Sequence, residues 1–217
     1  MDKRTVKIIA LLKEEYPDAK TALNFKTPLD ILVATILSAQ CTDKRVNLVT
    51  ESLFKKYRAA QDYAEANPAK FEQEIRSTGF FRNKTKNIIA AAKAIVKDYH
   101  GKVPDSMEEL IKLPGVARKT ATVVLFNAFH KIEGITVDTH VIRLSQRLGL
   151  SKNNDPKKIE QDLMMLLPNP IWGRFAYWII EHGRKVCIAK KPLCPQCVLK
   201  KLCPSYHLFM KKFYSKS

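Results

Sequence analysis

The stretch LPGVARKTATVVLFNAF, residues 113–129, sets the interpretation of the whole chain. Helical periodicity over residues 106–113 precedes it, and Gly115 permits a sharp turn and a close approach of the backbone to another group. The segment therefore predicts a helical hairpin whose second helix covers residues 118–129. The first amides of that helix lack intrahelical partners and favour a phosphate. A plain helical hairpin within an all-α core is the alternative.

Two cations, Arg118 and Lys119, open this second helix. A positive charge in the first turn of a helix is disfavoured by about 0.3–1 kcal/mol, and such a local inconsistency points toward function. The helix-terminal field and the neighbouring cations both favour the neutral amine, so we expect a lowered pKa for Lys119. A neutral amine is a nucleophile. Phosphate binding and a solvated surface position are the other interpretations of Lys119.

Helical spacing recurs along the chain, whereas the alternation typical of strands is not sustained anywhere, so the sequence predicts an all-α protein. Thr27-Pro28 predicts a helix N-cap and first turn, Asp43 predicts another N-cap, and Gly101 predicts a C-cap. The expected helices cover residues 5–16, 28–40, 44–54, 70–78, 83–99, 106–113, 118–129, 139–148, 156–166 and 172–186.

Four cysteines, Cys187, Cys194, Cys197 and Cys203, form a C-x6-C-x2-C-x5-C pattern within CIAKKPLCPQCVLKKLC. Four converging thiolates suit either a tetrahedral zinc ion or a cubane iron–sulfur cluster. The segment is too short to bury much apolar surface, so the metal centre would serve as its core. Disulfides are the alternative, but nothing else in the chain indicates secretion.

The chain of 217 residues carries a formal net charge of +17, and its 46% hydrophobic content excludes a disordered basic protein. A folded protein with this charge usually binds a polyanion, most often nucleic acid. From His182 to Ser217 there are nine Lys or Arg residues and no Asp or Glu. We interpret this segment as a phosphate-contacting surface; a solvated charged face is the alternative.

The N-terminal segment does not have the features of a signal peptide, and the longest apolar stretch, residues 31–39, is about half as long as a membrane span. We therefore expect no membrane partner and a cytoplasmic location, associated with the nucleoid if the host is bacterial. A monomer is the simplest expectation, because scanning for one lesion needs no symmetric partner.

Five segments together resemble the endonuclease III family of base-excision DNA glycosylases: LPGVARKTA, VDTH (137–140), the cysteine pattern, LSAQCTDKRVN (37–47) and GFFRNKTKNI (79–88). The resemblance implies a helix-hairpin-helix DNA glycosylase fold. A six-helix barrel would span residues 22–132. A second, discontinuous domain, residues 1–21 and 133–217, would hold a 4Fe-4S cluster through the four cysteines. Double-stranded DNA with a damaged base or an abasic site would bind in the cleft between them.

The resemblance also implies a bifunctional DNA glycosylase/AP lyase that removes oxidised pyrimidines. Lys119 stands at the position whose amine attacks C1′ of the damaged nucleoside, forms a Schiff base and nicks the strand by β-elimination. Asp138 matches the catalytic aspartate, which would stabilise positive charge on the sugar and help to deprotonate the amine. From the residues alone, the commoner role of such an aspartate is to cap the helix that starts near Thr139.

Such chemistry requires that the damaged nucleotide be flipped out of the duplex. By resemblance, Gln40 enters the duplex opposite the unpaired base and Phe80 wedges from the other side, with core packing as the alternative for Phe80. Ser38 and Asp43 match positions that line the base pocket. The remaining expected DNA contacts are Gly115, Ala117, Arg118, Thr120, His140, Lys190 and Lys191. For His140, an ordinary helix-start histidine is the alternative.

The chain departs from the family pattern at three places. Ala117 stands where many relatives have the second hairpin glycine, which costs about 1 kcal/mol if the residue needs a positive φ. Cys41 replaces the usual alanine, and we expect a small buried thiol near the pocket rather than a ligand. Phe80-Phe81 replaces a leucine and a tyrosine.

Two other functions fit parts of this pattern. The first is a monofunctional mismatch glycosylase for adenine or thymine, which Lys119 and the short tail after Cys203 disfavour. The second is a non-catalytic iron–sulfur protein that binds DNA, which the combination of Lys119 and Asp138 disfavours.

Overall fold

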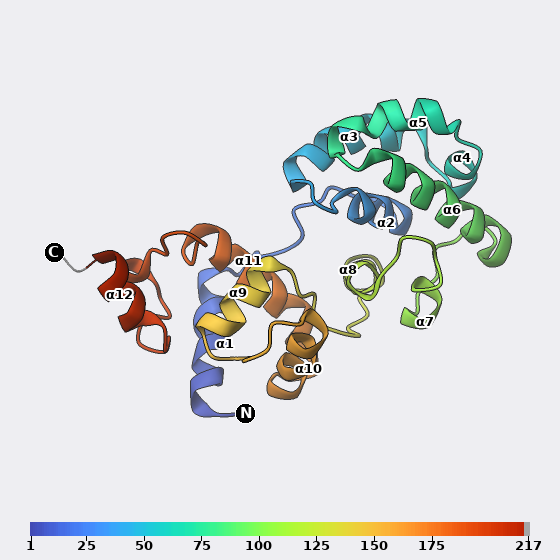
Figure 1. Ribbon diagram of the computed structural model, residues 1–217. Helices are drawn as coiled ribbons and strands as arrows, with labels where there is room; N and C mark the ends of the chain where they lie inside the picture. Colours follow the sequence, from blue (N-terminus) through green and yellow to red (C-terminus); the bar gives the residue numbers. More distant parts are fainter. Residues whose placement is uncertain (215–217) are drawn as a thin grey trace. The chain divides into compact units, whose positions relative to one another are not determined.

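A computed structural model describes residues 1–214, and every regular element among them is helical, as the sequence predicts (Figure 1). Residues 215–217, the end of the second predicted domain, lie outside the described part of the chain. No helix in residues 1–214 is long and apolar enough to cross a membrane.

The elements fall into α-helices and three short 3-10 turns, η1–η3. In chain order they are α1 (Lys3–Glu15), α2 (Pro28–Leu37), α3 (Asp43–Lys56), α4 (Ala60–Ala64), α5 (Pro68–Ile75), η1 (Arg76–Thr78), α6 (Phe81–Tyr99), α7 (Met107–Leu110), α8 (Arg118–Phe129), α9 (Thr139–Arg147), α10 (Pro156–Leu166), η2 (Asn169–Ile171), α11 (Trp172–Lys185), η3 (Cys194–Gln196) and α12 (Tyr206–Tyr214).

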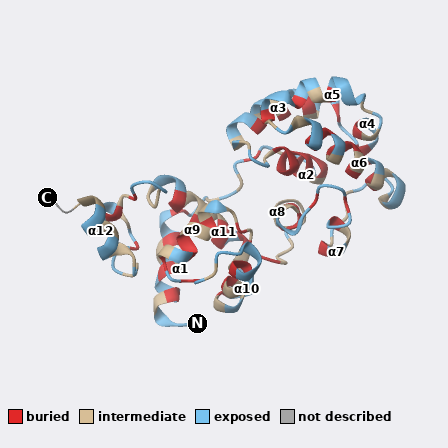
Figure 2. Ribbon diagram, in the orientation of Figure 1, coloured by how far each residue is buried: buried red, intermediate tan, exposed pale blue. Residues whose placement is uncertain are grey.

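The chain divides into two compact units. The central unit is Thr21–Glu133, and the terminal unit joins Met1–Lys20 to Gly134–Ser217. Each unit has a hydrophobic core of its own, visible as the buried stretches in Figure 2. Because the terminal unit is assembled from both ends of the chain, α1 packs with helices that follow it by more than 120 residues.

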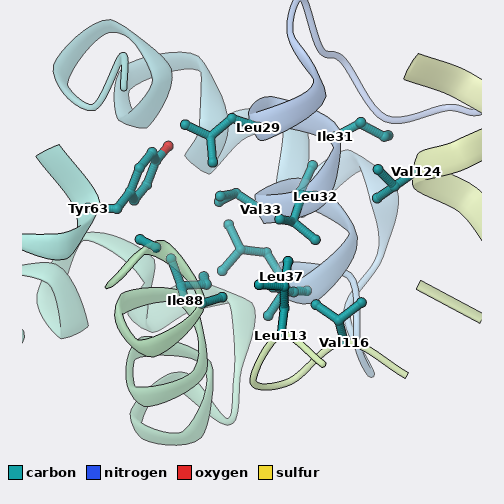
Figure 3. Close-up of a cluster of buried hydrophobic side chains, with 14 of the residues drawn as sticks. Leu29, Ile31, Leu32, Val33, Leu37, Tyr63, Ile88, Leu113, Val116 and Val124 are labelled. Carbon is teal, nitrogen blue, oxygen red and sulfur yellow. The ribbon is translucent and has the colours of Figure 1, made fainter. Parts of the chain in front are cut away.

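The central unit is built around α2, whose sequence PLDILVATIL is apolar on nearly all sides. A helix of this kind is stable only when other helices surround it, and its residues from Leu29 to Leu37 are all buried. The capping box at its start, in which Thr27 and Asp30 exchange hydrogen bonds with each other's backbone, confirms the predicted N-cap. Leu113 and Val116 of the hairpin belong to the same buried cluster as Leu37, so this core also anchors the hairpin (Figure 3).

The terminal unit packs α1, α9, α10 and α11 around one core. Ile8, Leu144, Phe175 and Ile179 are fully buried in it. Helices α9 and α11 approach so closely that a Cβ on Gly183 would stand 2.7 Å from Nδ1 of His140. The same approach places the start of α9 against α11.

Several predicted boundaries are wrong in instructive ways. The helix expected to run to Gln40 ends at Leu37, and Gln40 adopts a left-handed φ of 53°. Thr42, rather than Asp43, caps α3: its hydroxyl accepts from the amide of Arg45. The helix expected over 70–78 is α5 followed by η1, and the one expected over 106–113 is reduced to α7.

Two helices were not predicted, α4 and α12. Helix α4 has only five residues, too few to show a period. Helix α12 is held by distant contacts, since the Tyr214 hydroxyl donates to the Pro192 carbonyl at 2.9 Å and the Phe209 ring packs 4.7 Å from the Arg147 guanidinium.

Candidate functional site

The hairpin turn depends on Gly115. Its φ of 77° belongs to the left-handed region, and a Cβ built on it would stand 2.6 Å from Cβ of Asn87 on α6. Both the turn and the close approach predicted for this glycine are therefore present. Ala117 has an extended backbone, with φ −85° and ψ 167°, so alanine at this position causes no backbone strain.

Gly115→Ala is expected to lower the free energy of unfolding by more than the cost of backbone strain at this position. Strain of a left-handed alanine costs about 1–2 kcal/mol, and the new methyl group also collides with Asn87. Gly101→Ala is a matched control, since its φ is 79° and a Cβ there meets nothing within 4 Å. Denaturant unfolding should show a clearly larger loss for Gly115→Ala; equal losses would contradict the close packing of the turn.

Lys119 is the second residue of α8 and is exposed. Ala117, the N-cap residue, offers no side-chain acceptor to the first amides of the helix. Arg118 is also exposed, and its guanidinium donates to the Glu133 carbonyl at 3.3 Å. Thr120 is half-buried. The start of α8 therefore presents an amine, a guanidinium and helix amides on one short segment, which is a favourable place for a phosphate.

Two loops of the central unit carry the residues expected to enter DNA. Phe80 has a left-handed φ of 47° and a side chain that is 62% exposed, so the core-packing alternative for Phe80 is wrong. Phe81 packs against the core instead. Gln40 is exposed as well. An exposed phenylalanine in a strained backbone is unusual, and strain of this kind concentrates at functional sites.

Ser38 and Asp43, which are expected to line the base pocket, are less exposed than Gln40 and Phe80. Ser38 is half-buried, and its hydroxyl donates to the Thr35 carbonyl at 2.8 Å. Asp43 is the half-buried first residue of α3. Cys41, expected to be buried, is only half-buried because it follows the end of α2 in the turn.

Asp138 lies in the terminal unit as the N-cap of α9. Its Oδ1 accepts hydrogen bonds from the amides of His140, at 2.8 Å, and Val141, at 2.9 Å. The capping role expected from the residues alone is therefore present. Both bonds end on Oδ1, so the cap uses one of the two carboxylate oxygens. The side chain is half-buried, which leaves part of it accessible.

His140 packs inside the terminal unit. Its Nδ1 lies 3.1 Å from a guanidinium nitrogen of Arg143, and Gly183 packs against the ring. Burial lowers the pKa of His140, and the nearby Arg143 adds to this while Asp138 opposes it. A neutral ring that accepts from Arg143 fits these surroundings. The structure thus favours the ordinary packing role, and the DNA contact stays a prediction.

All four predicted cysteine ligands line one pocket in the terminal unit, together with Leu144, Arg147, Tyr206 and Phe209. Among residues 1–214, no three His, Cys, Asp or Glu side chains are grouped as they would be around a single metal ion. The thiols surround a space instead of meeting at a point. Burial raises the pKa of Cys194 and Cys203, and raises that of Cys197 to about 12.

Arg147, at the end of α9, holds the cysteine segment in place. Its guanidinium donates to the Ile188 carbonyl at 2.9 Å and the Ala189 carbonyl at 2.8 Å, and reaches Sγ of Cys187 at 3.3 Å. Its own carbonyl accepts from the Cys203 thiol at 3.4 Å. The sequence alone does not indicate this role, because an arginine at a helix end gives no sign of its distant partners.

His182 is a second residue that sequence reasoning missed. It is 1% exposed, and its ring nitrogens lie 2.9 Å from the Tyr16 hydroxyl and 3.4 Å from Sγ of Cys197. Burial lowers the pKa of His182 to about 4, so the ring is neutral. A neutral ring can accept a hydrogen bond from the Tyr16 hydroxyl through Nδ1 and donate one to Sγ of Cys197 through Nε2.

The expected phosphate contacts Lys190 and Lys191 are both exposed. Lys191 lies 5.3 Å from the centre of the Tyr214 ring, so α12 orients one of the two ammonium groups.

Comparisons with known proteins bear on the fold and the family of this chain. The profile of the HhH-GPD superfamily of base excision DNA repair proteins matches residues 33–169. Endonuclease III of Synechocystis sp. is 57% identical over 202 residues, 93% of this chain and 92% of that protein. A solved structure of a non-covalent endonuclease III–DNA complex matches with a TM-score of 0.90 and 40% identity, covering 97% of this chain and all of that one. A trapped endonuclease III–DNA covalent intermediate matches equally well.

Proposed function

This chain belongs to the HhH-GPD superfamily of base excision DNA repair proteins, and we propose that it is a bifunctional DNA glycosylase/AP lyase for oxidised pyrimidines. The observation that carries the proposal is the placement of Lys119. Its amine is exposed in the first turn of α8, shortly after the turn at Gly115, so it is accessible to a DNA strand. The trapped covalent complex of a 40% identical relative supports covalent chemistry at this site.

Two side chains would share the chemistry. The Lys119 amine attacks C1′ of the damaged nucleoside and displaces the base. The sugar ring then opens by cleavage of the C1′–O4′ bond, which leaves a Schiff base between Lys119 and C1′. Loss of a C2′ proton and departure of the 3′-phosphate by β-elimination nick the strand. The Asp138 carboxylate stabilises the positive charge that develops on the sugar and takes a proton from the attacking amine. Asp138 keeps an oxygen outside the helix cap for this purpose.

The DNA contacts would come from loops, the hairpin and the basic C-terminal segment. Gln40 and Phe80 fill the space left by the flipped nucleotide, and their exposure suits that role. Ser38 and Asp43 line the base pocket. The other proposed contacts are Gly115, Ala117, Arg118, Thr120, His140, Lys190 and Lys191.

Double-stranded DNA is the partner of this site, and we place the protein, as a monomer, in the cytoplasm.

The cysteine pocket would hold a 4Fe-4S cluster through Cys187, Cys194, Cys197 and Cys203. Thiols that surround a space suit a cluster several atoms wide better than one zinc ion. The cluster supplies a structural core for a segment with little apolar surface. Around it, Arg147 donates to the Cys187 sulfur and His182 faces the Cys197 sulfur, both of which stabilise thiolate charge.

Cys197→Ser is expected to remove the cluster and to destabilise the terminal unit. The purified wild type should contain iron and acid-labile sulfide in equal amounts, and the variant should lose both and melt at a lower temperature. Cys41→Ser is the matched control, because this thiol lies in the central unit. Zinc in place of iron, or full iron retention by Cys197→Ser, would contradict the proposal.

The function is tested on a duplex with one thymine glycol, with sodium borohydride added to trap a Schiff base. We expect a covalent protein–DNA band and, without borohydride, a nicked strand. Base loss that appears only after alkali would indicate a monofunctional glycosylase instead. Binding without either product, on this lesion and on an abasic site, would indicate a non-catalytic DNA-binding protein.

A further inference from the structure

Lys84 on α6 is a buried lysine whose ammonium group donates hydrogen bonds to backbone carbonyls at the ends of two helices. The side chain is 4% exposed, and its ammonium donates to the Leu37 carbonyl at 2.7 Å and to the Thr78 carbonyl at 2.8 Å. Leu37 is the last residue of α2 and Thr78 the last of η1. Carbonyls at helix C-termini carry partial negative charge and lack intrahelical donors, so one ammonium compensates both ends.

Each of these carbonyls is followed directly by one of the two DNA-facing loops. The chain passes from Leu37 through Ser38 and Ala39 to Gln40, and from Thr78 through Gly79 to Phe80. Because a single nitrogen atom bonds to both carbonyl oxygens, the starting points of the two loops are held at a fixed separation.

The loops themselves are strained. Gln40 and Phe80 both have positive φ, at 53° and 47°, which costs a non-glycine residue about 1–3 kcal/mol. Such conformations persist only where the surroundings determine them. Exposed side chains do little to hold a loop, so the restraint must come from the buried side, where Lys84 bonds to the backbone that precedes each loop.

We propose that Lys84 is a positioning residue for nucleotide flipping, which fixes the loops of Gln40 and Phe80 relative to each other before DNA binds. The inference rests on the proposed function, because it gives both loops the task of entering the duplex. Flipping a nucleotide costs a few kcal/mol, and side chains that fill the gap offset the cost only if they stand at the correct spacing. Without the ammonium, the two loops would move independently.

The test compares Lys84→Met on two substrates. The first is a duplex in which thymine glycol faces adenine; in the second, the same lesion faces a one-nucleotide gap, so no base pair has to be broken and no orphaned base remains. Single-turnover rates should fall by about tenfold or more on the paired duplex and by less than about threefold on the gapped one. Lys86→Met, an exposed lysine two residues further along α6, is the control and should show no such difference.

A second variant covers the case in which Lys84→Met fails to fold. Gly79 has φ 70° and ψ 161°, a region open essentially to glycine alone, and a Cβ there meets nothing within 4 Å. Gly79→Ala therefore disturbs the Phe80 loop without touching the core, and should show the same preference for the gapped duplex. Equal losses on both duplexes, or no loss, in a folded variant would overturn the role of Lys84. A wild type inactive on both would overturn the proposed function itself.

Discussion

Lys119→Ala is expected to abolish the borohydride-trapped protein–DNA band and to reduce strand nicking by at least about 10³-fold. The methyl group cannot attack C1′ or form the Schiff base that makes β-elimination possible, so both steps lose their nucleophile. Folding should be unaffected, because the side chain is exposed and stands in the first turn of α8. Removal of a cation from a helix N-terminus even favours the helix slightly.

The control for this variant is Lys112→Ala. Lys112 is also exposed and lies just before the hairpin turn, where its ammonium pairs with Glu109 at 2.6 Å. Loss of a positive charge alone should weaken DNA binding to a similar extent in both variants, whereas only Lys119→Ala should lose the covalent band. A trapped band that persists in Lys119→Ala would mean that another amine is the nucleophile.

The parts of the fold that the sequence predicts are those with local causes. Helix α8 begins and ends where predicted, and the Thr27 cap lies where proline in the first turn indicates. In both cases the decisive interactions join residues a few positions apart. The turn at Gly115 also follows from local backbone preference, although its contact with Asn87 depends on the tertiary fold.

The parts that the sequence does not predict depend on distant partners. Lys84 and Lys86 look alike in the sequence, yet one is buried against two helix ends and the other is exposed. Arg147 and His182 likewise give no local sign that they surround the cysteine sulfurs. Helix α12 forms where its rings meet Arg147 and Pro192, which lie well before it in the chain.

The candidate site shows the same division. Spacing alone indicates the cysteine pattern, because the ligands of one metal centre lie close together in the chain. Lys119 is indicated by its place as a cation in the first turn of a predicted helix and by the resemblance of its motif to a known family. The exposure of Phe80 was left open by the sequence, since Phe80 and Phe81 are adjacent and either could pack inside. The backbone decides between them: the left-handed conformation at Phe80 turns its ring outward and leaves Phe81 to the core.

Asp138→Asn is expected to separate the two roles of this residue. Asparagine is as good an N-cap as aspartate, and its side-chain oxygen can accept from the amides of His140 and Val141 as Oδ1 does now. The free energy of unfolding should therefore change by less than about 0.5 kcal/mol. Glycosylase activity should fall by about 100-fold or more, because a neutral amide neither stabilises a positive sugar nor takes a proton.

Asp138→Ala provides the comparison, since it removes both the cap and the charge. It should lose activity to the same extent and, in addition, about 1 kcal/mol of stability from the uncapped amides of α9. Chemical denaturation and single-turnover base release, measured on both variants, distinguish the roles. If Asp138→Asn keeps full activity while Asp138→Ala loses it, the carboxylate acts only as a helix cap, and the charge near C1′ must come from another residue.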